Sequence, residues 1–136
     1  GECSDLDFSG TTDVFSTGEA FIAFNRAEGT AQCWGGVDGG GDCTGLNFSG
    51  ITNIYSNAKA FVALNKFAGT AFCWGRKSAG GDCRNVNFAG VTHVQSTLLA
   101  FMGLSQGAGS VVCWGDPEYG GDCTKDDRVP RNGISD

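Results

Sequence analysis

A repeat of 40 residues runs through the chain and limits the folds open to it. The segment Cys-Ser-Asp-Leu-Asp-Phe at 3–8 recurs in related form at 43–48 and 83–88. The same step relates the Ala-Phe, Cys-Trp-Gly and Gly-Gly-Asp segments, with no insertion or deletion. A unit of this length cannot bury a core alone, so the copies are expected to pack on one another. The three copies cover residues 3–42, 43–82 and 83–122.

The pattern of each copy predicts three strands separated by glycine. In the second copy, short runs of β-branched, aromatic and aliphatic residues predict strands at 51–56, 60–65 and 70–74. The middle run is apolar at both alternating sets of positions, so both of its faces are expected to be buried. A tight hairpin between the second and third strands needs a residue with positive φ, and each copy has a glycine there. These glycines are Gly29, Gly69 and Gly109.

The repeats therefore predict an all-β fold. We expect residues 1–123 to form one small domain, in which three tandem repeats close into a pseudo-threefold unit that is propeller-like or prism-like. Residues 124–136 abandon the pattern and carry charges, Pro and Gly. This polar C-terminal tail is expected to be either a loosely held terminus or an arm that orders against a partner.

Composition excludes several classes of function. Nine Lys and Arg against fifteen Asp and Glu give a formal net charge of -6, so we expect no nucleic-acid partner. The apolar runs, such as 20–24, are far shorter than the roughly 20 residues that span a bilayer. We expect a soluble chain with no membrane span. No basic and then apolar leader opens the sequence, so we expect a mature segment.

Seven cysteines in so short a chain favour an oxidising compartment, since cytosolic thiols are kept reduced. Two pairings fit the spacing. The first bridges each Gly-rich loop through Cys33–Cys43, Cys73–Cys83 and Cys113–Cys123, and it leaves Cys3 unpaired. The second joins Cys3 to Cys33, Cys43 to Cys73 and Cys83 to Cys113, and it leaves Cys123 unpaired.

We favour the first pairing, because the strand that leaves Trp-Gly and the chain that enters after Gly-Gly-Asp can lie side by side across the loop. Under this pairing Cys3 belongs to a loop whose first half is missing, so either the chain continues upstream or Cys3 bonds a partner. Structural zinc fits the cysteines poorly, since no Cys-x-x-Cys is present and the chain has only one His.

No motif marks a catalytic centre. Three repeated aspartates could hold calcium if symmetry brought them together, but turn capping explains them better. The repeated Trp could form a platform for a sugar or pigment, yet Trp beside a disulfide usually packs in the core. His93 has no counterpart in the other copies and no marked nucleophile. The glycine run at 35–41 lacks the Lys-Ser/Thr of a phosphate loop. We predict no enzyme, no cofactor and no metal.

The order of the segments resembles repeats of the regulator-of-chromosome-condensation kind. An Ala-Phe-x-Ala-Leu strand, a Gly-x-x-x-Cys-Trp-Gly strand and a Gly-rich loop carry this resemblance, most clearly at 54–75. Residues 114–122, together with Val-Thr-His-Val at 91–94, are similar to short tandem repeats abundant in proteins of dinoflagellate algae. The resemblance implies β-propeller blades. Gly-Gly-Asp replaces the Gly-Gln-Leu-Gly element of the family, so nucleotide-exchange activity is not expected.

These features together favour a non-catalytic structural or interaction protein that docks on a larger assembly. The resemblance to dinoflagellate repeats, the acidity and the disulfides suggest an extrinsic accessory subunit on the thylakoid-lumen side of an algal photosystem with its light-harvesting antennae. The alternative is a secreted or lumenal lectin-like module that binds carbohydrate. The Gly-rich loops differ most between copies, so they are predicted to contact the partner. The residues concerned are Arg76, Lys77, Asp116, Pro117, Glu118 and Tyr119.

Overall fold

The computed structural model describes residues 6–124, and within that range nine strands form three separate sheets. The first sheet contains β1 (Asp13–Ser16), β2 (Ala20–Asn25) and β3 (Thr30–Gly35). The second contains β4 (Asn53–Ser56), β5 (Ala60–Asn65) and β6 (Thr70–Gly75). The third contains β7 (His93–Ser96), β8 (Ala100–Ser105) and β9 (Ser110–Gly115). A short 3-10 helix follows each sheet: η1 (Val37–Gly39), η2 (Lys77–Ala79) and η3 (Pro117–Tyr119).

Each sheet is an antiparallel meander whose strands follow chain order. The pairing register is the same in all three, because Ser16 faces Phe21, Ser56 faces Phe61 and Ser96 faces Phe101. The prediction of an all-β chain of three repeats of about 40 residues is therefore confirmed. The expected glycines have positive φ, at 69° for Gly29, 71° for Gly69 and 67° for Gly109.

Two strand boundaries of the second repeat differ from the sequence prediction. The third strand extends to Gly75 rather than ending at residue 74. The first strand of the second repeat begins at Asn53 rather than at residue 51. The reason is a turn, in which the Ile51 N–H donates to the Phe48 carbonyl at 3.2 Å. The middle strand has the predicted limits, Ala60–Asn65.

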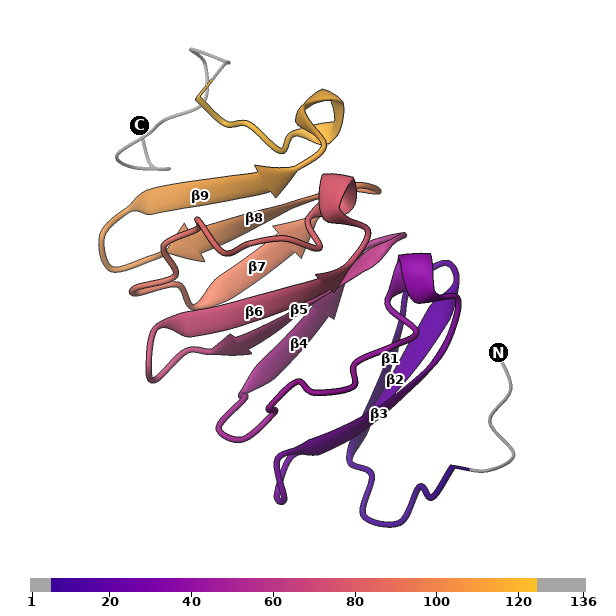
Figure 1. Ribbon diagram of the computed structural model, residues 1–136. Coiled ribbons are helices and arrows are strands. Elements are labelled where there is room, and N and C mark those ends of the chain that lie inside the picture. Colours follow the sequence, from indigo (N-terminus) through magenta and orange to yellow (C-terminus); the bar gives the residue numbers. More distant parts are fainter. Residues whose placement is uncertain (1–5, 125–136) are drawn as a thin grey trace.

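The sheets stand in an open row, with the first and third at opposite ends and the second between them (Figure 1). The first strand of each sheet contacts the first strand of the next, β1 with β4 and β4 with β7. The three 3-10 helices lie along one edge of this row (Figure 1). The expected pseudo-threefold closure is not seen, because the two successive packing steps leave the two end sheets apart (Figure 1).

Apolar side chains fill the two junctions between sheets. Ile22 and Phe24 of the first sheet cluster with Ile54 of the second. At the other junction, Val62 and Leu64 of the second sheet cluster with Val94 of the third. Among the described strands, β5 alone is the middle strand of a sheet that has another sheet on each side, and it is buried on both faces as the sequence predicts. The other middle strands leave part of one face open, at Phe21 in β2 and at Met102 and Leu104 in β8.

No helix within residues 6–124 has the length and apolar character needed to cross a membrane. The predictions for Cys3 and for most of the 124–136 tail fall outside the described residues.

Candidate interaction surface

Three disulfides close the Gly-rich loops. They join Cys33 to Cys43, Cys73 to Cys83 and Cys113 to Cys123, with Cα–Cα distances of 5.8, 5.7 and 5.7 Å. These are the bridges of the favoured pairing. Disulfides persist in oxidising compartments, so the three bridges indicate that the protein resides in one.

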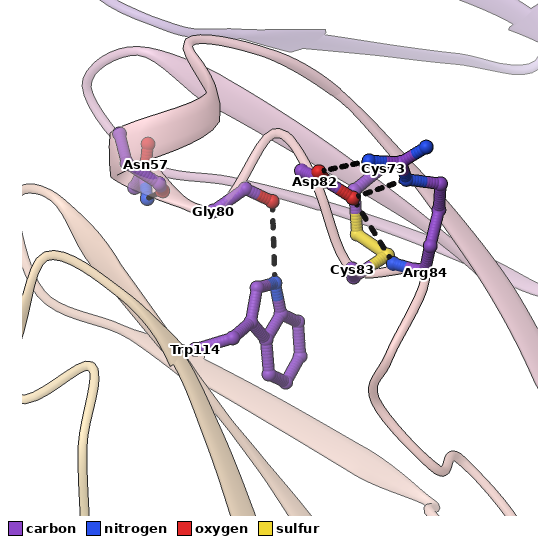
Figure 2. The surroundings of a disulfide bond; sticks show 8 residues. Asn57, Cys73, Gly80, Asp82, Cys83, Arg84 and Trp114 are labelled. Carbon is purple, nitrogen blue, oxygen red and sulfur yellow. Dashed lines mark hydrogen bonds and ion pairs between the residues drawn. A yellow bond between two sulfur atoms is a disulfide. The ribbon is translucent and has the colours of Figure 1, made fainter.

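The repeated aspartates cap turns. Asp42 Oδ1 accepts the Thr44 N–H at 3.0 Å, and Asp122 Oδ1 accepts the Thr124 N–H at 3.0 Å. Asp82 Oδ1 likewise accepts the Arg84 N–H at 3.3 Å (Figure 2). The sequence favours turn capping for these aspartates, and this prediction is confirmed. Within residues 6–124, no three His, Cys, Asp or Glu side chains gather in a way that could hold a metal ion.

Asp82 differs from the other two because Arg84 also binds its side chain. The guanidinium donates to both carboxylate oxygens, at 2.9 Å from Nε and 2.8 Å from Nη2 (Figure 2). These side-chain bonds lower the pKa of Asp82 to about 2. The carboxylate is therefore ionised and engaged within its own loop, and it is unsuited to proton transfer near neutral pH.

The loop residues predicted to contact a partner fall into two groups. Arg76 contacts the preceding repeat, because its Nε donates to Asp38 Oδ2 at 2.9 Å. This contact lowers the pKa of Asp38. The residues of the last loop form η3, where Asp116 Oδ1 accepts the Glu118 N–H at 2.9 Å. A partner contact at either group, or at Lys77 in η2, stays a prediction.

A buried Trp lies in each junction between repeats and donates a hydrogen bond to the preceding repeat. Trp74 Nε1 donates to the Gly40 carbonyl at 3.1 Å, and Trp114 Nε1 donates to the Gly80 carbonyl at 3.2 Å (Figure 2). Trp74 stacks on Phe61 with ring centroids 5.1 Å apart. Both indoles are buried, so for these two Trp the packing role is confirmed.

The same aromatic group is more open in the first repeat, where Trp34 is half-buried rather than buried. Trp34 stacks on Phe21 at 5.5 Å and meets Phe8 edge-on at 5.3 Å. Phe21 is 42% exposed and Phe8 is 40% exposed, whereas their counterparts in the later repeats are buried. Trp34 Nε1 has no hydrogen-bond acceptor among residues 6–124, because no sheet precedes its own there. Together with Val14, which is 58% exposed, these residues form what we call the aromatic end: Phe8, Val14, Phe21 and Trp34.

A second open surface lies at the other end of the row, on the third repeat. An apolar hollow of about 280 Å³ there is lined by residues that include Phe101, Met102, Tyr119 and Gly120. Tyr119 is 40% exposed, and its carbonyl accepts the Thr97 hydroxyl at 2.7 Å. We call this surface the hollow end and define it by five residues: Thr97, Met102, Leu104, Tyr119 and Gly120.

The sequence pattern singles out Tyr119 of the hollow end as a loop residue, but it does not single out the aromatic end. The Ala-Phe and Cys-Trp-Gly motifs are the same in all three repeats, so no local signal separates Trp34 from its buried counterparts. His93, the one histidine, is exposed at the start of β7, where its Nδ1 lies 2.9 Å from Thr92 Oγ1.

Comparison with known proteins identifies the fold alone. No protein-family model matches the chain, and no curated protein matches it. Among solved structures, the chain is similar to the entire ectodomain of the receptor kinase CR4 from Physcomitrella patens, with a TM-score of 0.58 and 17% identity. The match covers 76% of this chain and 30% of that one. At this identity the likeness supports the architecture of small tandem β-sheet repeats and carries no activity.

Proposed function

We propose that this protein is a non-catalytic interaction module that docks on a larger assembly in an oxidising compartment. The observation that carries the proposal is the aromatic end. Its Phe21 is exposed and its Trp34 is half-buried in the first repeat, whereas the same residues of the other two repeats are buried in a junction. A clustered apolar surface of this kind is typical of a protein interface.

The state of the polar groups supports the same class of function. The aspartates of the Gly-rich loops cap their own turns, and Asp82 is further held by Arg84. Disulfides fix the loops that carry them. A scaffold whose polar side chains are committed to its own turns offers a rigid surface for docking rather than a set of groups for acid-base chemistry.

The finer placement of the protein is also part of the proposal. We infer that the repeats are of the regulator-of-chromosome-condensation kind found in dinoflagellate proteins, and that the protein serves as an extrinsic lumenal subunit of an algal photosystem with its antennae. The motif order and the three disulfides support this inference. Closure of the open row into a propeller-like ring would require further repeats beside these three.

Native isolation from the source cells tests the docking function. We expect the protein to migrate with a membrane-associated complex, and mass spectrometry of that complex should find photosystem and antenna subunits. A Trp34→Ala variant should fail to rebind complexes stripped of the native protein. Phe67, 87% exposed in the hairpin of the second repeat, provides the matched control, and Phe67→Ala should rebind normally. Migration of the native protein as a free monomer would contradict the proposal.

A lectin-like function is the alternative, and one observation favours it. The stacked Phe21 and Trp34 rings leave an aromatic surface that a sugar ring could cover. The buried Trp74 cannot serve this purpose. Binding to a glycan array that is lost in Trp34→Ala and retained in Phe67→Ala would support the alternative, and an array with no binding would eliminate it.

A further inference from the structure

We propose that the aromatic end of one copy of this chain docks into the hollow end of a second copy, head to tail. The proposal rests on the proposed function, because it names the partner of the same docking surface. It starts from a property of the row: the molecule contains the same junction twice, and its two ends carry the two unmatched halves of that junction.

The indole hydrogen bond shows the match at the level of single atoms. Trp74 donates to the carbonyl of Gly40 and Trp114 donates to that of Gly80, each one repeat earlier. The next carbonyl in this series belongs to Gly120, on the hollow end. The indole without an acceptor among residues 6–124 belongs to Trp34, on the aromatic end. A second copy placed one repeat step beyond the first would bring this donor and this acceptor together.

The space around the loop glycines supports the same placement. A Cβ added to Gly40 would lie 2.5 Å from the Phe61 ring, and one added to Gly80 would lie 2.6 Å from the Phe101 ring. Within the part of the chain that the structure describes, a Cβ at Gly120 would meet nothing within 4 Å. The position that an aromatic ring occupies beside the first two glycines is therefore open beside the third. Phe21 of a second copy is the ring that would fill it.

The apolar contacts follow the same series. Ile54 packs with Ile22 and Phe24 of the preceding sheet, and it is only 4% exposed. Val94 is buried in the equivalent way by Val62 and Leu64. The third set in this series is Val14 on the aromatic end, with Met102 and Leu104 on the hollow end. Val14 is 58% exposed in the single chain, and docking would bury it.

Two backbone hydrogen bonds that link successive repeats support the same head-to-tail placement. The Gly18 N–H donates to the Ala58 carbonyl at 2.8 Å, and the Ala58 N–H donates to the Leu98 carbonyl at 3.0 Å. Among residues 6–124, these two bonds leave the Leu98 N–H without an acceptor and the Gly18 carbonyl without a donor. In a head-to-tail pair, the Leu98 N–H of one copy would donate to the Gly18 carbonyl of the next.

The contact is heterologous, because it joins two different surfaces. Such contacts generate rings when the rotation closes and open fibres when it does not. Each copy would present one free end after docking, so a dimer can add further copies. If one copy has a blocked aromatic end and the other has a blocked hollow end, association should therefore stop at the dimer.

Two end-blocked variants test the proposal. Val14→Glu places a charge on the aromatic end, and Met102→Glu places one on the hollow end. We expect the unmodified full chain to associate with rising concentration in sedimentation velocity, and we expect each variant alone to be monomeric, with association weakened about 30-fold or more. An equimolar mixture should form a dimer and nothing larger. The unmodified aromatic end of the Met102→Glu variant can dock into the unmodified hollow end of the Val14→Glu variant, and both remaining ends are blocked.

Controls separate this result from misfolding. Phe67→Glu alters an exposed residue away from both ends and should associate like the unmodified chain. Near-ultraviolet circular dichroism and the mass of non-reduced peptides should show folded variants with intact bridges. An unmodified chain that stays monomeric up to millimolar concentration, or a mixture of two folded variants that stays monomeric, overturns the proposal. If that monomer still migrates with a larger complex in native isolation, self-docking fails while the docking function stands; if it migrates alone, both fail.

A gain-of-affinity variant tests the register of the contact. At the first internal junction Glu19 pairs with Lys59 at 2.8 Å, and Asp38 pairs with Arg76. Across two docked copies the equivalent pairs are Glu19 with Leu99 and Glu118 with Gly36. Leu99→Lys with Gly36→Arg would complete both ion pairs, and we expect association to tighten about 2- to 30-fold at low salt. The gain should disappear at high salt. Unchanged or weakened association would contradict this register.

Discussion

Trp34, Trp74 and Trp114 occupy the same position in successive repeats but differ in what surrounds them. Trp114 Nε1 donates to the Gly80 carbonyl at 3.2 Å, and the indole is 5% exposed. Trp34 has the same stacked neighbour, Phe21, but no acceptor for its Nε1 among the described residues. The same residue type in the same local structure therefore occurs in two states. The indole of Trp114 is buried against the preceding repeat, and that of Trp34 is partly open.

Replacing these Trp with Phe should separate the hydrogen bond from the stacking. Trp114→Phe leaves the buried Gly80 carbonyl without its donor, and we expect the free energy of unfolding to fall by about 1 to 3 kcal/mol. Trp34→Phe removes no such bond and should change it by less than about 0.5 kcal/mol. Urea unfolding of both variants measures the difference, and equal losses would show that the indole bond contributes nothing.

Asp82 should be an unusually strong acid for a surface carboxyl. Its pKa of about 2 lies below the ordinary value of 3.8, chiefly because the Arg84 side chain binds the ionised form. The pKa is lowered in the folded state, so the resulting stability is present above pH 3.8 and is lost as the pH falls toward 2. An NMR titration of the carboxyl carbon should give this midpoint, and Arg84→Ala should move it back toward 3.8 while leaving Asp42 unchanged. A midpoint unaffected by Arg84→Ala would contradict this cause.

At the scale of elements, one side chain in each repeat ties the turn before the middle strand to the 3-10 helix. Thr17 Oγ1 donates to the Gly39 carbonyl at 2.7 Å, and Thr97 Oγ1 donates to the Tyr119 carbonyl at 2.7 Å. In the second repeat Asn57 takes this role, donating from Nδ2 to the Ala79 carbonyl at 2.7 Å. Its Oδ1 also accepts the Ala60 N–H at 2.9 Å. The residue types differ, yet the link is the same.

This equivalence makes a specific prediction for Asn57. Asn57→Ala removes these two hydrogen bonds and a third, from the Lys59 N–H to Oδ1, at a buried site, and we expect the free energy of unfolding to fall by about 2 to 4 kcal/mol. Asn57→Thr restores the side chain found in the other two repeats and should cost about 1 kcal/mol or less. Chemical denaturation compares the two. A threonine variant as unstable as the alanine variant would show that the link is not interchangeable.

The elements could be predicted from the sequence because local patterns determine them. The 60–65 strand, the hairpin glycines and the favoured disulfide pairing all agree with the structure. Closure could not be predicted, because it depends on the angle at which one sheet packs on the next, and periodicity carries no information on that angle. The ion pair of Arg76 with Asp38 in the neighbouring repeat could not be predicted either, because it depends on how the two loops pack, and the contact of Arg76 with a partner stays a prediction.

At the scale of the whole molecule, position in the row decides what each repeat exposes. The second repeat has a neighbour on each side, so β5 is buried throughout. The first repeat lacks a preceding neighbour among the described residues and leaves Phe21 exposed and Trp34 partly open, while the third leaves Met102 and Leu104 partly open. The exposed apolar surface is thus a consequence of an open row, which is the reason to expect that something docks there.

Footprinting of the natively isolated protein tests this central claim most directly. Carbene labelling, followed by mass spectrometry, should mark Phe21 and Trp34 in the purified monomer and leave them protected in the native assembly. Phe67, which is 87% exposed and lies away from both ends, provides the internal reference and should be labelled equally in both states. The predicted result is that Phe21 and Trp34 are protected in the native assembly and Phe67 is not. Equal labelling of all three residues in both states would contradict the claim that the aromatic end is the docking surface.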